Sequence, residues 1–335
     1  MLGPRLVKPD AGWEGFSADH SMSGMSKWTV ADMPSLDGRL AVVTGANSGL
    51  GLITARELAR SGAEVVVAAR NTEKGAAAVS EIESDVPSAK LSLEKLDLGS
   101  LDSVRSFADR FRAAHDGLDL LINNAGVMAP PRSETKDGFE LQIGTNHLGH
   151  FALTGLLLAE MEGREDARVV TVSSGAHRFG RINFDDLQSE RKYSRWRAYG
   201  QAKLANLLFA FELERRLSAA DSTIKSLAAH PGYAATNLQS ASAPTFDRLV
   251  MVVTNKVIAQ SAEIGALSIL YAATYPNLEG GTYVGPDGIG EQRGHPEPVG
   301  SGAAARDEAN ARRLWEVSEE LTGVSYDSLS TPRSS

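Results

Sequence analysis

The stretch Thr44-Gly45-Ala46-Asn47-Ser48-Gly49-Leu50-Gly51 decides the fold. It follows the apolar run Leu40–Thr44, which has the length of a buried strand, and it leads into the helical pattern Leu52–Arg60. Its three glycines permit a tight turn and let a ligand approach bare backbone, and the amides at a helix N-terminus favour a pyrophosphate. The turn therefore predicts a dinucleotide-binding unit. The candidate cofactor contacts in it are Gly45, Asn47, Ser48, Gly49, Leu50 and Gly51.

Further along the chain, strand-length apolar runs alternate with helical stretches. Short apolar strands that alternate with helices indicate a parallel sheet covered on both faces. We therefore predict an α/β fold, a single-domain Rossmann-like, doubly wound, seven-stranded parallel sheet with helices on both faces. The predicted strands are Leu40–Thr44, Glu64–Ala68, Leu91–Leu96, Leu118–Ile122, Arg168–Val172, Ile224–Ala229 and Thr282–Val284.

Some segments depart from this alternation. Residues 1–38 show no sustained period, so we predict a flexible N-terminal leader, followed by a Rossmann-type domain over 39–325 and a C-terminal tail over 326–335. Two excursions, 176–197 and 238–260, follow predicted strands at their carboxyl ends, where open α/β sheets bind ligands. We expect residues 176–197 to shape a pocket and residues 238–260 to form a substrate lid.

Composition excludes several classes of protein. The 335 residues are 42% hydrophobic, which suffices for a full core, but no apolar run reaches the length of a membrane span. The chain has no cysteine, so disulfide frameworks, thiolate nucleophiles and cysteine-ligated zinc are excluded. The net charge of −8, without a Lys/Arg-rich run, argues against nucleic-acid binding. We expect a cytoplasmic monomer or homodimer with no metal site.

The end of the second predicted strand indicates which dinucleotide binds. NAD-binding folds usually place Asp or Glu there, to accept a hydrogen bond from the ribose 2′-hydroxyl. Here Ala69 occupies that position and Arg70 follows at once. A guanidinium binds a 2′-phosphate, and Asn47 and Asn71 can add hydrogen bonds. We therefore predict NADP(H), and the alternative is that Arg70 is a solvated residue at a strand end.

Tyr199 and Lys203 form the candidate catalytic pair. They are four residues apart in a predicted helix, so their side chains share one face. Hydride transfer between an alcohol and a carbonyl needs a group that gives or takes a proton. A phenol, with a pKa of about 10, needs help for this task, and we expect the ammonium of Lys203 and an oxidised nicotinamide to favour the phenolate. We therefore interpret Tyr199 as the general acid/base.

Several motifs occur together in the order of a known family. With them, the chain from about Arg39 to Val284 resembles the short-chain dehydrogenase/reductase family. Further features resemble the retinol dehydrogenases and their bacterial relatives within it. The shared motifs are the glycine turn, Asn123-Asn124-Ala125-Gly126, Tyr199-Gly200-Gln201-Ala202-Lys203 and His230-Pro231-Gly232. The subgroup features are Asn146-His147-Leu148-Gly149-His150-Phe151, the long segment after Ser174, Lys203-Leu204-Ala205-Asn206 and the C-terminal stretch Ala311–Val324.

The resemblance implies a catalytic set of Asn146, Ser174, Tyr199 and Lys203. Ser174 would bind the substrate oxygen and hold it toward Tyr199, whereas Ser173 is expected to bond the backbone. Asn146 would hold a water that links Lys203 to bulk solvent. From the residues alone, Asn146 is equally a buried amide that is bonded to helix backbone.

The resemblance also implies the other cofactor contacts. The adenine side would be formed by residues after the third and fourth strands, and the nicotinamide side by residues after the sixth strand. We interpret His147 and His150 as packing or helix-surface residues and His230 as structural. The implied cofactor contacts are Asp97, Leu98, Asn124, Ala125, Gly126, Tyr199, Lys203, Pro231, Gly232 and Thr236.

These observations favour an NADP(H)-dependent oxidoreductase that interconverts an alcohol and a carbonyl compound. A hydrophobic substrate fits the apolar stripe Phe246, Val250 and Val253 in the lid segment, although a lid helix that buries its own face gives the same pattern. The alternative function is a non-catalytic NADP-binding sensor or scaffold. Such relatives usually lose the tyrosine or the lysine, and this chain has both.

Overall fold

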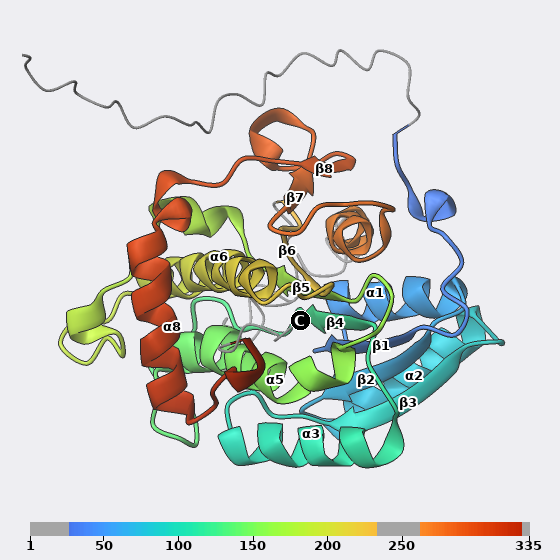
Figure 1. Ribbon diagram of the computed structural model, residues 1–335, viewed down its shortest axis with the longest axis horizontal. Coiled ribbons are helices and arrows are strands. Elements are labelled where there is room, and N and C mark those ends of the chain that lie inside the picture. The colour runs from blue at the N-terminus through green and yellow to red at the C-terminus, as the bar shows by residue number, and fades with distance from the viewer. Residues whose placement is uncertain (1–26, 233–261, 330–335) are drawn as a thin grey trace, which may run out of the picture.

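The central element of the protein is a sheet of eight strands, seen in a computed structural model that describes residues 27–232 and 262–329 (Figure 1). The strand order is β3-β2-β1-β4-β5-β6-β7-β8, so the chain crosses over between β3 and β4 as in a doubly wound fold. The strands are β1 (Leu40–Thr44), β2 (Glu64–Ala69), β3 (Lys90–Lys95), β4 (Leu120–Asn123), β5 (Arg168–Val172), β6 (Lys225–Ala229), β7 (Tyr283–Pro286) and β8 (Pro296–Pro298).

The predicted fold class is confirmed, with one correction to the strand count. Strands β1 to β7 pair in parallel, whereas β8 pairs antiparallel with β7, with Val284 opposite Pro298. The run Pro296-Glu297-Pro298 has no apolar period, and for this reason the sequence did not predict a strand there. Proline is tolerated in it because an edge strand bonds a neighbour on one side only.

Helices cover both faces of the sheet. Helices α1, α2 and the helix of residues 262–274 pack on one face, and α3, α5 and α6 pack on the other, with α8 outside α6 (Figure 1). Alternate residues of β1 point to opposite faces of the sheet. Ala41 and Val43 therefore pack in the core beneath α1 and α2, and Val42 packs in the core beneath α3 and α5. The helices are α1 (Gly49–Arg60), α2 (Thr72–Asp85), α3 (Leu101–Ala114), α4 (Leu141–Ile143), α5 (Gly149–Leu157), α6 (Arg195–Ala219), residues 262–274 and α8 (Glu308–Thr322).

Short helical turns connect these elements. Most are 3-10 turns, and the turn between α4 and α5 is a π-helix. The short turns are Val30–Asp32, Gly144–Leu148, Leu158–Met161, Gly175–Phe179, Phe184–Asp186, Ile289–Glu291, Ala303–Arg306 and Asp327–Leu329. Among residues 27–232 and 262–329, no helix combines the length and the apolar character that a bilayer crossing requires.

The packed domain extends beyond both boundaries that the sequence predicted. Trp28 lies in the predicted leader, yet its ring packs edge-on against Tyr271 at 5.3 Å between centroids, and Leu36 is buried. Tyr326 lies in the predicted tail, yet it is buried and its hydroxyl donates to the Phe151 carbonyl at 2.7 Å. A single buried aromatic residue produces no periodic pattern in the sequence. For this reason the predicted domain, residues 39–325, left out packed residues at both of its ends.

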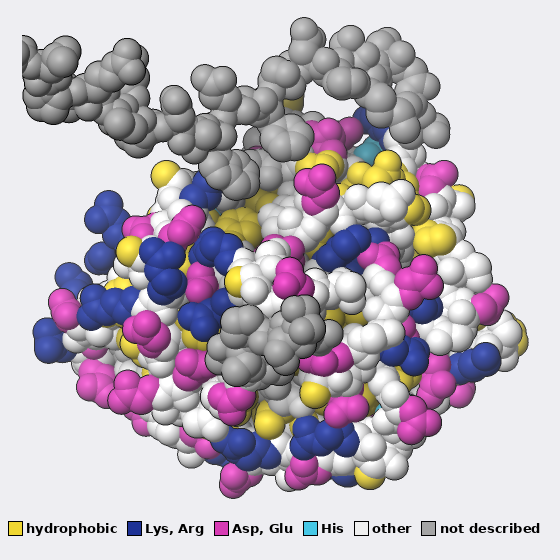
Figure 2. Space-filling view, in the orientation of Figure 1, with side chains coloured by type: hydrophobic (Ala, Val, Ile, Leu, Met, Phe, Trp, Pro, Cys, Tyr) yellow, Lys and Arg dark blue, Asp and Glu magenta, His cyan; other side chains and the backbone are white. Residues whose placement is uncertain are grey.

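Charged side chains of both signs share the surface. In Figure 2, dark-blue and magenta side chains are interspersed over α8 and the neighbouring loop. One such pair within α8 is Arg312 and Glu308, with 3.0 Å between Nη1 and Oε2. Exposed pairs of this type add little to stability.

Candidate active site

A cavity of about 700 Å³ lies at the carboxyl ends of the parallel strands. This is the edge at which doubly wound sheets bind their ligands. The predicted residues that line it are Gly45, Asn47, Ser48, Gly49, Leu50, Gly51, Arg70, Asp97, Leu98, Asn124, Ala125, Gly126, Ser174, Tyr199, Lys203, Pro231 and Gly232. Thr236 and the lid segment 238–260 fall outside the described residues.

The glycine turn between β1 and α1 provides room for a ligand. Gly45 and Gly49 have φ angles of 68° and 57°, in the left-handed region that favours glycine. A Cβ on Gly51 would lie 2.5 Å from both Asn124 Nδ2 and the Gly45 carbonyl oxygen, so the turn can close only with glycine there. Gly49, by contrast, faces open space at the start of α1. A pyrophosphate therefore fits the residues present.

Thr44, which the sequence analysis did not single out, joins this turn to the loop after β4. Its hydroxyl oxygen accepts hydrogen bonds from the backbone amides of Asn124 and Ala125, both at 2.9 Å. The same oxygen lies 2.9 Å from His150 Nε2. Thr44 is fully buried, and a buried hydroxyl at the end of an apolar strand is the signal that could have identified it.

Arg70 and Asn71 have different surroundings. Arg70 lines the cavity with an exposed side chain, and it makes no ion pair or side-chain hydrogen bond with any described residue. Asn71 does not line the cavity, and its Oδ1 caps α2 by accepting from the Lys74 amide at 2.9 Å. The structure thus brings the guanidinium to the cavity but assigns Asn71 to the helix start.

Asp97 and Leu98 line the cavity at the end of β3. One carboxylate oxygen of Asp97 accepts from the Gly99 amide at 3.1 Å, and the other lies 3.7 Å from Lys136 Nζ. Leu98 is buried against Gly149, where a Cβ would lie 2.4 Å from the Leu98 carbonyl oxygen. Both residues are therefore held in place by contacts with neighbouring residues.

Tyr199, Ser174 and Lys203 meet at the other end of the cavity. Ser174 makes a side-chain hydrogen bond with Tyr199, which is 7% exposed. Lys203 Nζ lies 5.9 Å from the centroid of the Tyr199 ring and donates to the Val172 carbonyl at 3.0 Å. The tyrosine and lysine lie on one helix, α6, which places both side chains in the same cavity.

Burial shifts the pKa values of both Tyr199 and Lys203. Burial raises the pKa of Tyr199, and the hydrogen bond from Ser174 opposes this only in part. Burial also lowers the pKa of Lys203 to about 8. We expected the Lys203 ammonium and an oxidised nicotinamide to favour the phenolate. Among the protein groups alone, the loss of hydration on burial dominates and favours the protonated phenol.

Asn146 lies in the π-helical turn Gly144–Leu148. π turns inside helices often occur at functional sites. The buried side chain of Asn146 accepts from the Val127 amide at 2.8 Å and donates to the Val127 carbonyl at 2.9 Å. A Cβ on Gly126 would lie 3.1 Å from Asn146 Oδ1 and 3.8 Å from Lys203 Nζ. Asn146 is thus a buried amide bonded to backbone next to Lys203, and its water relay stays a prediction.

The neighbouring polar residues have structural partners. Ser173 Oγ donates to the Lys203 carbonyl at 2.7 Å, which confirms the predicted backbone bond. His147 bonds Ser318 of α8 at 2.9 Å, and burial lowers the pKa of His147 to about 3. His150 lies 3.0 Å from the Asn146 carbonyl oxygen. Both histidines pack inside the protein, and neither lies on the helix surface.

Comparison with known proteins agrees with this site. The sequence pattern of the family described as short chain dehydrogenase matches residues 39–246. The chain is 43% identical to retinol dehydrogenase 12 from Homo sapiens over 296 residues, which cover 87% of this chain and 89% of the relative. It is also 43% identical to polyprenol dehydrogenase from Mus musculus over 299 residues, with 87% and 86% covered. The chain belongs to the short chain dehydrogenase family.

A solved structure supports the same assignment. An uncharacterised protein from Mycobacterium paratuberculosis is 49% identical, with a TM-score of 0.77 and coverage of 90% of this chain and 99% of that one. The resemblance inferred from the motifs, including its retinol-dehydrogenase-like character, is therefore confirmed. As a member of this family, the chain is an oxidoreductase.

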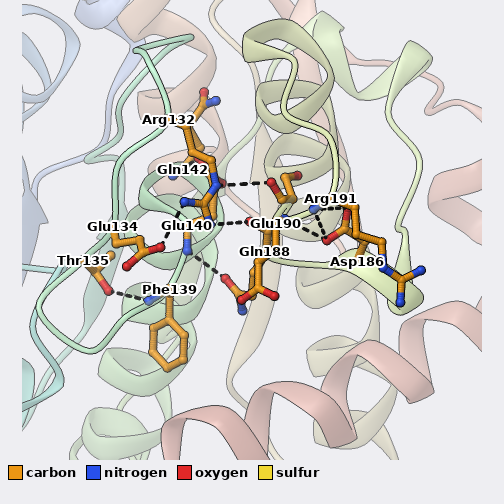
Figure 3. A network of polar contacts seen from close by, with 11 residues as sticks. Arg132, Glu134, Thr135, Phe139, Glu140, Gln142, Asp186, Gln188, Glu190 and Arg191 are labelled. Carbon is orange, nitrogen blue, oxygen red and sulfur yellow. Dashed lines mark hydrogen bonds and ion pairs between the residues drawn. The ribbon is translucent and has the colours of Figure 1, made fainter.

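In this short chain dehydrogenase, the excursion after β5 is fixed to the loop after β4. Figure 3 shows Glu140 and Arg132 bonded to this excursion, where the Glu140 amide donates to Gln188 Oε1 at 2.7 Å. Gln142 accepts from the Ala129 amide at 2.8 Å and donates to the Arg195 carbonyl at 3.0 Å. This network connects the cavity-lining loop to the start of α6, as we expected of a segment that shapes the pocket.

Two aromatic side chains of the dehydrogenase lie beside Tyr199. Phe179 and Trp196 line the cavity although they are 55% and 53% exposed. The Trp196 ring stands edge-on to Tyr199, with 6.1 Å between centroids. A Cβ on Gly200 would lie 2.8 Å from the Phe179 ring, so glycine there lets this ring approach α6. No sequence motif contains these two aromatic residues, so neither was predicted as part of the site.

Proposed function

We propose that the protein is an NADP(H)-dependent oxidoreductase that interconverts an alcohol and a carbonyl compound, with Tyr199 as general acid/base. One observation carries the proposal. Ser174, Tyr199 and Lys203 lie at one end of a cavity whose other end contains the glycine turn and Arg70. A nicotinamide that occupied this cavity would supply or accept the hydride, and the remaining chemistry belongs to the chain.

The protein side chains would handle the oxygen and the proton. Ser174 Oγ, already bonded to Tyr199, would hold the substrate oxygen within reach of the phenol. Because burial raises the pKa of Tyr199, the phenol keeps its proton at neutral pH and is ready to donate it to a carbonyl. Lys203, anchored on the Val172 carbonyl, would stabilise the phenolate that remains.

Arg70 supports NADP(H) over NAD(H). A guanidinium without an ion-pair partner among the described residues is available for a 2′-phosphate. The position expected to hold an acid in an NAD-binding fold is Ala69, which is buried and neutral. No residue there would repel the phosphate or replace it by bonding a 2′-hydroxyl.

The walls near Tyr199 favour a hydrophobic substrate. Phe179, Trp196 and Met128 present apolar surface to the cavity. Rings that stay exposed next to a catalytic group lose water when an apolar molecule binds, which favours such a ligand. Two relatives are named for the alcohols retinol and polyprenol. We therefore infer an apolar or aromatic alcohol, aldehyde or ketone.

A cofactor-oxidation screen tests the proposal. The wild-type protein is mixed with NADPH or NADH and a panel of aldehydes and ketones, and Tyr199→Phe is run in parallel. We expect turnover with NADPH, and loss of turnover with retained NADPH binding in the variant. A wild-type protein that binds NADPH but turns over nothing would favour the non-catalytic sensor or scaffold. A preference for NADH would overturn the argument from Arg70.

A further inference from the structure

Two buried histidines have no part in the proposed chemistry, yet they lie directly behind it. His177 is in the turn Gly175–Phe179 after β5, and His230 directly follows β6. They are 1% and 2% exposed. Both pack on the ring of Tyr283, with centroid distances of 5.6 Å and 5.1 Å. One therefore follows the proposed catalytic serine, and the other precedes the Pro231–Gly232 turn of the cavity wall.

The contacts of His177 assign a single neutral tautomer. Its Nδ1 lies 2.7 Å from the Ser174 carbonyl oxygen, and because a carbonyl only accepts, Nδ1 carries the proton. Its Nε2 accepts from the Gly302 amide at 3.1 Å, so this nitrogen carries none. The imidazole thus ties the backbone of Ser174 to the segment that follows β8.

The contacts of His230 assign the opposite tautomer. The Gly232 amide donates to Nδ1 at 3.3 Å, so the proton resides on Nε2. That nitrogen lies 3.1 Å from Glu291 Oε2. The other oxygen of Glu291 pairs with Arg178 Nη2 at 2.6 Å. Glu291 therefore pairs with Arg178, the residue after His177, and its other carboxylate oxygen lies close to the imidazole of His230.

We propose that His177 and His230 are positioning residues of the active site. This proposal rests on the proposed function. His177 sets Ser174 against Tyr199 through the Ser174 carbonyl, and His230 sets the Pro231–Gly232 turn that lines the nicotinamide side of the cavity. Neither imidazole touches the reacting atoms, and each acts through the backbone of the residue that it holds.

We call the hydrogen bonds of His177 and His230 to backbone the histidine brace. The brace can form only while both imidazoles are neutral. A proton added to His177 would place Nε2–H against the Gly302 N–H, two donors face to face, and a proton added to His230 would oppose the Gly232 N–H in the same way. Arg178 disfavours these protons, Glu291 favours them, and the other histidine disfavours the proton on His230. Burial lowers the pKa of both imidazoles, so the brace is intact at neutral pH.

Paired substitutions separate positioning from simple packing. His177→Phe and His230→Phe keep a ring but remove both nitrogens, whereas His177→Asn and His230→Asn keep a polar atom in place of Nδ1. We expect His177→Phe to lower kcat about tenfold with an unchanged Kd for NADPH, since one hydrogen bond contributes roughly this much. We expect His230→Phe to raise the Kd for NADPH about tenfold, by the same hydrogen-bond argument. The asparagine variants should recover most of each loss.

The control is His147→Phe, in an equally buried histidine whose partner is Ser318 on α8. We expect it to lower the melting temperature but to leave kcat and the Kd for NADPH within about twofold of wild type, because its lost hydrogen bond lies outside the site. If phenylalanine supported activity as well as asparagine at positions 177 and 230, both residues would only fill space and the proposal would be overturned.

A spectroscopic measurement tests the brace without turnover. In ¹⁵N-histidine NMR spectra of the intact protein, we expect His177 protonated at Nδ1 and His230 at Nε2. The opposite tautomer at either residue would contradict the proposal, even if the protein turned over every substrate. If the wild type oxidised no NADPH, the proposed function would fail, and the NMR tautomers and the NADPH affinity of the His230 variants would still decide the brace.

Discussion

The two ends of the cavity are built in different ways. At the β1–α1 end, the shape comes from bare backbone, because the space at Gly49 is open and a Cβ on Gly51 would collide with Gly45 and Asn124. At the β5–α6 end, the shape comes from buried polar side chains that bond backbone, such as Lys203 to Val172 and Ser173 to Lys203. Substitutions that add volume should therefore impair cofactor binding at the β1–α1 end. Substitutions that remove a hydrogen bond or a charge should impair function at the β5–α6 end.

The largest effect is expected at the β5–α6 end, in Tyr199→Phe. The ring and its packing against Trp196 remain, and only the phenolic oxygen is lost. Because general acid–base catalysis contributes about 10²–10⁴-fold, we expect kcat to fall by roughly that factor. The Kd for NADPH should stay unchanged, which titration of protein fluorescence would check. Retained turnover would mean that another group moves the proton.

The glycine end should respond to volume. Gly51→Ala places a Cβ against the Gly45 carbonyl and Asn124, so we expect the turn to shift and the Kd for NADPH to rise by about tenfold or more, the cost of one or more lost hydrogen bonds. The matched control is Gly38→Ala, at a φ of 77° with open space around it. That variant should lose stability but keep its NADPH affinity. Equal affinities in both variants would refute the steric account.

Arg70 should decide between the two dinucleotides. We expect Arg70→Ser to lower the preference for NADPH over NADH by about ten- to hundredfold, because hydrogen bonds to charged groups are worth about 1.5–3 kcal/mol. Lys74→Ser is the control, since this exposed lysine does not line the cavity. The ratio of kcat/KM for the two cofactors measures the effect. An unchanged ratio in Arg70→Ser would remove the argument for NADP(H).

The smallest effect concerns the cost in folding stability of burying Lys203. Burial lowers the pKa of Lys203 from 10.5 to about 8, so the unfolded state binds more protons between these values. The cost is fully present below about pH 8 and declines as the pH rises toward 10.5. We therefore expect Lys203→Met to melt a few degrees higher than wild type at pH 7, with a smaller difference at pH 10. Asn206 Nδ2 still satisfies the Val172 carbonyl in that variant.

The β1–α1 end was easier to predict from the sequence than the β5–α6 end. Its turn is a local pattern, in which glycine spacing, the preceding strand and the following helix lie within one short stretch. The shared helix face of Tyr199 and Lys203 was also predictable, because side chains four residues apart lie on one face of a helix. The same local reasoning explains why the parallel sheet was predicted in nearly every strand.

What the sequence did not predict depends on contacts between distant segments. His177 meets Gly302 and Gln142 meets Arg195, and neither pair leaves a periodic signal. Asn71 was assigned to the cofactor by proximity to Arg70, but the helix start needed its side chain as a cap. The antiparallel strand β8 lacks an apolar run, so its pairing with β7 could be found only in the structure.

Transfer of a labelled hydride tests the central claim most directly. NADPH that carries deuterium at the transferable position is incubated with the protein and an aromatic aldehyde, and the alcohol formed is examined by mass spectrometry. We expect the alcohol to carry one deuterium per molecule with the wild-type protein, and Tyr199→Phe to form almost none in the same time. An NADPH-bound wild-type protein that formed no labelled alcohol from any carbonyl compound in the panel would contradict the account.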